Sequence, residues 1–395
     1  MPPASPSLYP YALIFILILV ILADVSGSLL DTPEVRLLEM AVCRNYYREH
    51  DPSVIGPPPL SYVDEKYCKI SEIQVPLVFL RTKKGLLSFI PGVLLAIPYG
   101  RLSDRRGRKP VLFLGILGQA LAYFWTLFVC YFHQIFDIRL VLLSPAFFII
   151  GGGPRVLSAA AYSVVIDVAP EDVRTTVFYL VGAGAIVCDV IMAPVGSWLL
   201  DKDLWLPFHF SSVILILAVV MTLFMPETLT ADKRASSLEV PGMSGELNAG
   251  HQTNWQMITT SLRQNVSYII SALNVAWGTR ELRLCLLIIF IFMFNISSGV
   301  LSIIYASNLL GWSISRIGYL ISVNSMVTLG VLVTLAFLSQ YLERRLGARP
   351  LALDVNVVRA SSIVLGVAGL LMGLTNKWTV ITGKQRTGRA KNCCS

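Results

Sequence analysis

Residues 100–110 read GRLSDRRGRKP, a charged stretch that separates two long apolar runs, 77–100 and 111–132. A run of about 20 apolar residues is long enough to cross the hydrocarbon core of a bilayer as a helix. Lys and Arg residues in short connections between such helices stay on the cytoplasmic side. The stretch therefore predicts a cytoplasmic connection between two membrane-spanning helices.

The composition of the whole chain is typical of a membrane protein. Of its 395 residues, 55% are hydrophobic and 14% are charged, and the mean hydropathy is +0.67. A water-soluble domain does not carry this composition on its surface. The net charge of +8 comes from basic residues between apolar runs rather than from one basic face, so we do not expect nucleic acid as a partner.

Nine apolar runs predict nine membrane-spanning helices, and the expected fold class is an all-α polytopic transmembrane helix bundle. Basic residues concentrate after the second, sixth and eighth runs, which places the amino terminus in the cytoplasm and a long loop, 31–76, outside. The runs are 9–30, 77–100, 111–132, 140–166, 175–200, 208–225, 284–305, 317–340 and 355–375.

The chain divides at a polar stretch of small residues after the sixth run, which cannot form a packed core. The basic tail at the carboxyl end would lie outside after nine spans, against the charge rule. We therefore expect a truncated or misread form of a longer protein. The expected parts are a first six-helix bundle, 1–229, a cytoplasmic linker with an amphipathic helix, 230–281, a partial second bundle of three helices, 282–376, and the tail, 377–395.

The stretch at 100–110 resembles the signature loop of the major facilitator superfamily, G-x-x-x-D-R-x-G-R-K, at its usual place between the second and third helices. The resemblance implies two six-helix bundles with a substrate cavity between them. Glycines permit a tight turn at a helix end, and the charged residues can form ion pairs that open and close as the bundles rock. An ordinary basic topology loop is the alternative. The residues of this gating motif are Gly100, Asp104, Arg105, Gly107 and Arg108.

Three further stretches bear on the resemblance. Residues 167–174, DVAPEDVR, are similar to the D-x-x-x-x-x-x-R stretch of the family, which makes Asp167 an expected partner of Arg108 and adds Arg174 to the motif. PETL at 226–229 is also familiar from the family. Residues 189–196, DVIMAPVG, keep the proline and last glycine of the family's antiporter pattern but lack its earlier glycines, so this run does not carry the full antiport motif.

Three charges in the first bundle lie at similar depth in their predicted helices. At 1.5 Å per residue, Asp24 lies about 22 Å, Asp189 about 21 Å and Arg155 about 17 Å from the inner ends of their runs. Together they could neutralise one another in the membrane, and the surplus carboxylate is a candidate proton carrier. In the alternative, Asp24 lies near the outer headgroups and Asp189 with Arg155 is a fixed structural pair.

Other residues have two interpretations each. The run of glycines at 151–153 predicts either a broken helix or, as we favour, close helix packing. Asn295 and Asn324 either line a solute path or tie helices together. Cys43 and Cys68 share the predicted outer loop, where an oxidising environment favours a disulfide over two free thiols.

The expected function is secondary active transport of a small organic solute, with proton-coupled efflux as one form of it. A non-transporting membrane receptor or scaffold, an inactive truncated transporter and an enzyme are the alternatives. The sequence carries no nucleotide-binding loop, metal-ligand spacing or nucleophile motif, so we expect no enzyme activity, cofactor or metal. The expected partners are the solute, protons and the lipid of a plasma membrane or an internal, vacuolar-type membrane.

Overall fold

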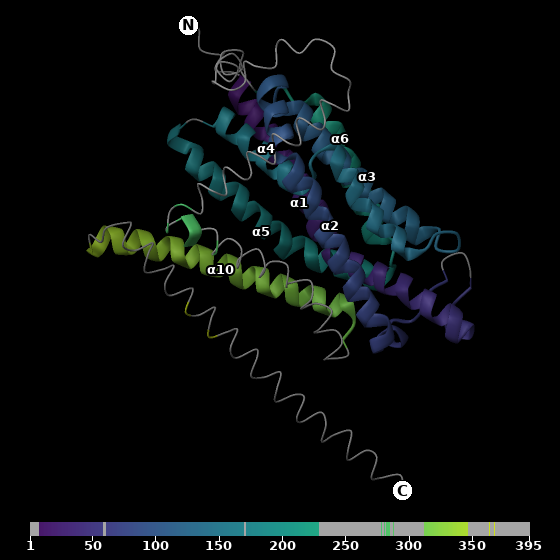
Figure 1. The fold of residues 1–395 in the computed structure, drawn as a ribbon. Coiled ribbons are helices and arrows are strands. Elements are labelled where there is room, and N and C mark those ends of the chain that lie inside the picture. The colour runs from purple at the N-terminus through teal and green to yellow at the C-terminus, as the bar shows by residue number, and fades with distance from the viewer. Residues whose placement is uncertain are drawn as a thin grey trace, which may run out of the picture. The chain divides into compact units, whose positions relative to one another are not determined.

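The computed structural model describes residues 8–57, 61–169, 171–228 and 312–346, with single positions at 278, 280, 282–284, 287, 363 and 367. These residues contain helices and connections and no strand. The chain separates into two compact units, Met1–Met326 and Val327–Ser395, which are described individually. The described elements are α1 (Leu8–His50), η1 (Pro52–Val54), η2 (Glu65–Cys68), α2 (Ser71–Arg106), α3 (Arg108–Tyr131), η3 (Ile138–Ile150), α4 (Gly153–Val168), α5 (Glu171–Lys202), α6 (Leu206–Phe224) and α10 (Ile314–Leu346) (Figure 1).

Seven of the described helical segments are long and apolar enough to cross a membrane. They correspond to the first six predicted runs and to the eighth. The predicted runs 284–305 and 355–375, the amphipathic helix of the linker, and the tail lie outside the described residues or are described only at single positions. The division of the chain into two bundles with a linker therefore stays a prediction.

The first helix is longer than the sequence predicts, and the expected loop at 31–76 is wrong at both ends, because α1 continues into it and α2 begins at Ser71. α1 continues through Pro33 to His50 and has 43 residues, which corresponds to about 64 Å at 1.5 Å per residue. Apolar residues continue to pack beyond the membrane run, because Val35, Leu37 and Leu38 are fully buried against other helices. Hydropathy did not reveal this extension since charged residues alternate with the apolar ones.

The connection at 100–110 is also largely helical, contrary to the prediction of a loop. α2 ends at Arg106 and α3 begins at Arg108, so Gly107 alone breaks the helix, with φ of 111°. A helix can continue past the bilayer into water, so the end of an apolar run does not mark the end of the helix. Gly100 lies inside α2, and no described atom lies within 4 Å of a Cβ placed there. Of the two predicted turn glycines, only Gly107 makes a turn.

The fourth predicted span breaks at its glycines. η3 ends at Ile150 and α4 begins at Gly153. Two adjacent glycines at this break have a left-handed backbone, Gly152 with φ of 76° and Gly153 with φ of 75°. A Cβ on Gly151 would overlap the backbone of Leu114 and Gly115 in α3. The break and the close packing that were offered as alternatives therefore occur together.

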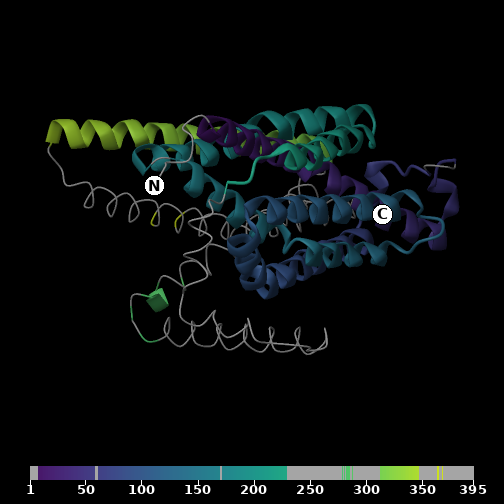
Figure 2. The same cartoon turned by 90° about the horizontal axis from the view of Figure 1, so that it is seen from above.

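The core of the first unit forms around α1, which packs against α5 and α6 (Figure 2). Buried apolar residues of α1, α3, α4, α5 and α6 share one cluster, while a second cluster joins the extension of α1 to α2, α3, η3 and α6. This packing fixes the helix ends that carry the charged residues. Following the predicted orientation, the inner end is the one with Arg108, and the outer end is the one with Cys68.

Candidate functional site

Arg108 is the centre of a charged network at the inner end. Its Nε donates to Asp167 Oδ2 at 3.0 Å, and its Nη1 donates to Asp104 Oδ1 at 2.8 Å and to Ser103 Oγ at 2.9 Å. The Arg108 and Asp167 side chains are 16% and 7% exposed, whereas that of Asp104 is 42% exposed. A guanidinium shared by two carboxylates forms charge-assisted hydrogen bonds, which are stronger than neutral ones.

The network joins the ends of three helices. Asp104 lies in the last turn of α2, Arg108 is the first residue of α3, and Asp167 lies in the last turn of α4. The turn at Gly107 places Arg108 four residues after Asp104 but in a new helix. The structure therefore brings together the three residues that the sequence grouped, and their role in gating stays a prediction.

Glu227, in the segment after α6, adds a further contact at the inner end. Its carboxylate accepts the backbone N–H groups of Arg108 at 2.8 Å and Lys109 at 3.3 Å, the first residues of α3. The free N–H groups and the positive end of the dipole make a helix amino terminus a favourable place for a carboxylate. Sequence reasoning missed this role, because a backbone N–H group has no sequence signature. The only sequence signal for Glu227 was the PETL stretch at 226–229, which is familiar from the family.

Two other residues of the motif have local contacts. Arg174, in α5, donates from Nη2 to the carbonyl oxygen of Ala169 at 3.5 Å, where α4 ends. A cation there faces the negative end of the α4 dipole. Arg105 lies in the last turn of α2 and is half-buried.

The predicted coupling residues separate into two places. Ser28 of α1, one turn after Asp24, donates from Oγ to Asp189 Oδ1 of α5 at 2.5 Å. Asp24 also lines a cavity of about 160 Å³ together with Ser158 and Tyr162 of α4. The bond from Ser28 places Asp189 beside the face of α1 that carries Asp24.

Arg155 lies at the contact between α4 and α2. Its guanidinium carbon is 5.6 Å from the centre of the Phe89 ring, a cation–π distance, and its side chain packs on Gly92. Asn324 is an exposed residue of α10, and Asn295 lies outside the described residues. The assignment of both asparagines to a solute path stays a prediction.

At the outer end, Cys43 and Cys68 form a disulfide with a Cα–Cα distance of 5.5 Å. The pairing is the one that the sequence favoured, but its setting differs, because Cys43 lies in α1 rather than in a loop. The disulfide ties the end of η2 to the extension of α1 and thereby closes the connection between α1 and α2.

The chain matches the family model of the Major Facilitator Superfamily over residues 76–382. It is 31% identical over 353 residues to the MFS efflux pump atnC of Emericella nidulans, covering 88% of this chain and 66% of that protein. The MFS transporter SAT21 of Stachybotrys chartarum is 27% identical, with 90% and 74% covered. The efflux pump ustT of Aspergillus flavus is 24% identical, with 90% and 68% covered. The chain thus spans about two thirds to three quarters of the length of these relatives.

Proposed function

The chain belongs to the major facilitator superfamily, and on this premise we propose that it is a secondary active transporter that exports a small organic solute across a membrane. The family model supports transport, and the names of two relatives, both called efflux pumps, support export. The expected all-α multi-pass membrane fold is confirmed by the family match and the seven candidate spans.

The network around Arg108 is the observation that supports the proposal best. It joins the ends of α2, α3 and α4 through bonds that include one exposed carboxylate, Asp104, and one buried carboxylate, Asp167. A transporter that alternates between two states needs contacts at its inner end that can open and reform. We assign this role to Arg108 with Asp104 and Asp167, with Arg105, Gly107 and Arg174 as supporting residues.

Solute efflux from yeast cells that lack their own exporters tests the proposal. Cells that produce the full chain are screened with a panel of toxic organic compounds, and export of a compound that they resist is measured directly. Asp104→Asn should reduce the export rate about tenfold without loss of membrane insertion, because it removes one charged partner of Arg108. Asp137→Asn, the same chemical change at an exposed residue that bonds Arg139 N–H, should export at the normal rate.

Normal export by Asp104→Asn would contradict the gating role. Binding of a compound with no flux in any variant would instead favour the alternative function, a membrane receptor.

Proton coupling through Asp24 or Asp189 is the second part of the proposal. Ser28, one turn from Asp24, bonds Asp189, and Asp24 lines a small cavity, an arrangement that supports a proton carrier at this place. Efflux measured against an imposed pH gradient should lose its pH dependence in Asp24→Asn or in Asp189→Asn. Unchanged dependence in both variants would make the pair structural.

A further inference from the structure

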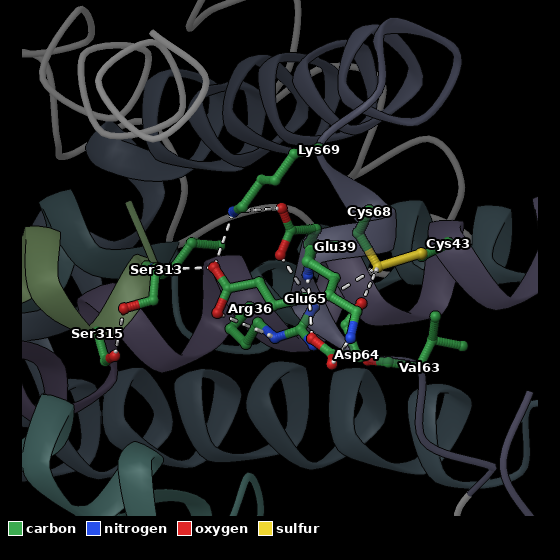
Figure 3. Close-up of polar contacts among 12 residues, drawn as sticks. Arg36, Glu39, Cys43, Val63, Asp64, Glu65, Cys68, Lys69, Ser313 and Ser315 are labelled. Atoms are coloured by element: carbon green, nitrogen blue, oxygen red, sulfur yellow. Dashed lines mark hydrogen bonds and ion pairs between the residues drawn. A yellow bond between two sulfur atoms is a disulfide. The ribbon is translucent and has the colours of Figure 1, made fainter. Parts of the chain in front are cut away.

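The segment at 61–70, between α1 and α2, packs on the extension of α1 beyond its membrane run, and we call it the lid. It contains η2 and ends at α2. Figure 3 shows charged side chains of α1 and of the lid meeting beside the disulfide. The same view includes Ser313 and Ser315, which lie at the start of α10.

The lid is anchored to α1 by bonds that leave it little freedom. Besides the disulfide from Cys68, Lys69 Nζ contacts Glu39 Oε1 at 2.9 Å, and Glu39 is fully buried. Arg36 donates to Glu39 Oε2 and to the carbonyl oxygen of Val63, both at 2.9 Å. The lid therefore moves with α1.

Glu65 connects the lid to α10. Its Oε1 accepts the backbone N–H of Ile314, the first residue of α10, at 2.7 Å and contacts Lys69 Nζ at 2.8 Å. Its Oε2 lies 3.8 Å from Arg36 Nε. A carboxylate at a helix amino terminus is stabilised both by the free N–H groups and by the helix dipole. The contact between Glu65 and Ile314 is thus a charge-assisted bond between two elements far apart in the chain.

The first turns of α10 pack closely behind this bond. A Cβ on Gly318 would overlap Ser197 of α5 and lies against Thr32 of α1. One turn further, Ser322 Oγ donates to the carbonyl oxygen of Val190 at 2.7 Å. In the structure, the start of α10 therefore packs closely against α1 and α5 next to the lid.

The junction also contains a polar cavity. A space of about 350 Å³ opens beside Glu65 and is lined by Arg36, Lys202, Ser313 and Ser315 among others. The Glu65 side chain is 22% exposed. If α10 moves away, the carboxylate keeps Lys69 and Arg36, which belong to the lid and to α1, and water can take the place of the Ile314 N–H. The bond can therefore open without leaving a buried charge unpaired.

We propose that Glu65 is a positioning residue of the transport cycle, which latches α10 against the lid when the outer side is closed and releases it when that side opens. This inference rests on the proposed transport function, because only a chain that alternates between two states needs the bond to break. Removing the charge of Glu65 should shift the population toward the state in which the start of α10 is open to the outside.

Thiol labelling tests the latch independently of any solute. In the full chain, Ser replaces Cys130, Cys188, Cys285, Cys393 and Cys394, the lid disulfide is kept, and Ser315→Cys is the reporter. Ser315 is 4% exposed and lines the polar cavity, so a membrane-impermeant maleimide reaches it only when α10 leaves the lid. Glu65→Gln should raise the labelling rate about tenfold, because its amide oxygen can accept the Ile314 N–H only as a neutral partner, and the difference between a charged and a neutral hydrogen bond is of this size.

Two further variants make the result specific. Glu65→Asp keeps the charge but shortens its reach to Ile314, and should give an intermediate labelling rate. Asp64→Asn changes the neighbouring carboxylate, which bonds Lys66 on the exposed side of the lid, and should label like the parent. Both variants should retain the lid disulfide and the parent's thermal unfolding midpoint.

Equal labelling of Glu65→Gln and the parent would overturn the latch. So would faster labelling accompanied by a lower unfolding midpoint or by loss of the disulfide, since Glu65 would then be structural. Faster labelling with an intact lid, in a protein for which no exported compound is found, would support the latch and count against the proposed export.

Discussion

The inner and outer ends of the described structure hold their charges in different ways. At the inner end, Arg108 links α2, α3 and α4, and Glu227 binds the start of α3 from the segment after α6. At the outer end, a disulfide fixes the lid to α1, and Glu65 reaches from the lid to α10. The described inner contacts join helices of the predicted first bundle, whereas the outer contact extends beyond it.

The difference shows which contacts can survive a movement of α10. A movement of α10 does not by itself break the bonds among α2, α3 and α4, so their loss should lower the stability of the first bundle in addition to impairing the proposed gating. The bond from Glu65 to Ile314 must break in such a movement, so its loss should change the population of states more than the stability. The variants below separate these two kinds of effect.

Asp167→Asn should have the largest effect on stability. Asp167 is 7% exposed and pairs with the largely buried Arg108, and removing one partner of a buried ion pair destabilises by about 3–5 kcal/mol. Thermal unfolding of the purified protein in detergent measures this. Asp104→Asn is the control, because Asp104 is 42% exposed and should have a much smaller effect on unfolding. Equal losses would show that burial does not separate the two carboxylates.

Removal of the outer disulfide should have the next largest effect. Cys43 and Cys68 are 25 positions apart, and the chain-entropy estimate for closing a loop of this size is about 3 kcal/mol. The double variant Cys43→Ser with Cys68→Ser should therefore unfold at lower temperature than the parent. Dithiothreitol should lower the midpoint of the parent and leave the double variant unchanged. A midpoint of the parent that resists reduction would contradict the assigned role of the bond.

Gly107→Ala should be moderately destabilising and Gly100→Ala should not. Gly107 has φ of 111°, and a Cβ there would overlap the Glu227 carboxylate, so alanine is both strained and crowded. Backbone strain of this kind costs about 1–3 kcal/mol. Gly100 lies inside α2 in open space, where alanine should stabilise the helix by about 0.5–1 kcal/mol. Paired unfolding curves test the two variants, and opposite signs are expected.

The smallest effect should be a pH dependence at the outer end. His133 is 8% exposed, and its Nδ1 lies 3.1 Å from Arg44 Nη1. Burial, followed by the charges of Arg44 and Arg48, lowers the pKa of His133. The unfolded chain therefore binds this proton more readily, and stability should fall as the pH decreases below about 6.5. His133→Gln should show a weaker loss of unfolding midpoint between pH 7 and pH 5 than the parent, and identical curves would contradict this.

The sequence predicted the membrane class, the helical fold and the residues of the inner network. Apolar runs of bilayer length and basic connections are properties of consecutive residues, and they can be read without knowing which helices touch. The grouping of Asp104, Arg108 and Asp167 came from a family motif, and such a motif reflects contacts that form in the folded state.

Tertiary structure alone decided the contacts between distant residues. Glu227 binds backbone N–H groups, Glu65 binds the first N–H of α10, and Ser28 of α1 binds Asp189 of α5. Hydropathy also did not reveal that α1 continues to His50, because other helices, and not the bilayer, cover the apolar residues from Val35 to Met40. The physical reason is the same in each case. A pattern of apolar and polar residues indicates whether lipid, water or protein surrounds a segment. A hydrogen bond or an ion pair depends instead on which atoms the packed helices bring within about 3 Å of one another.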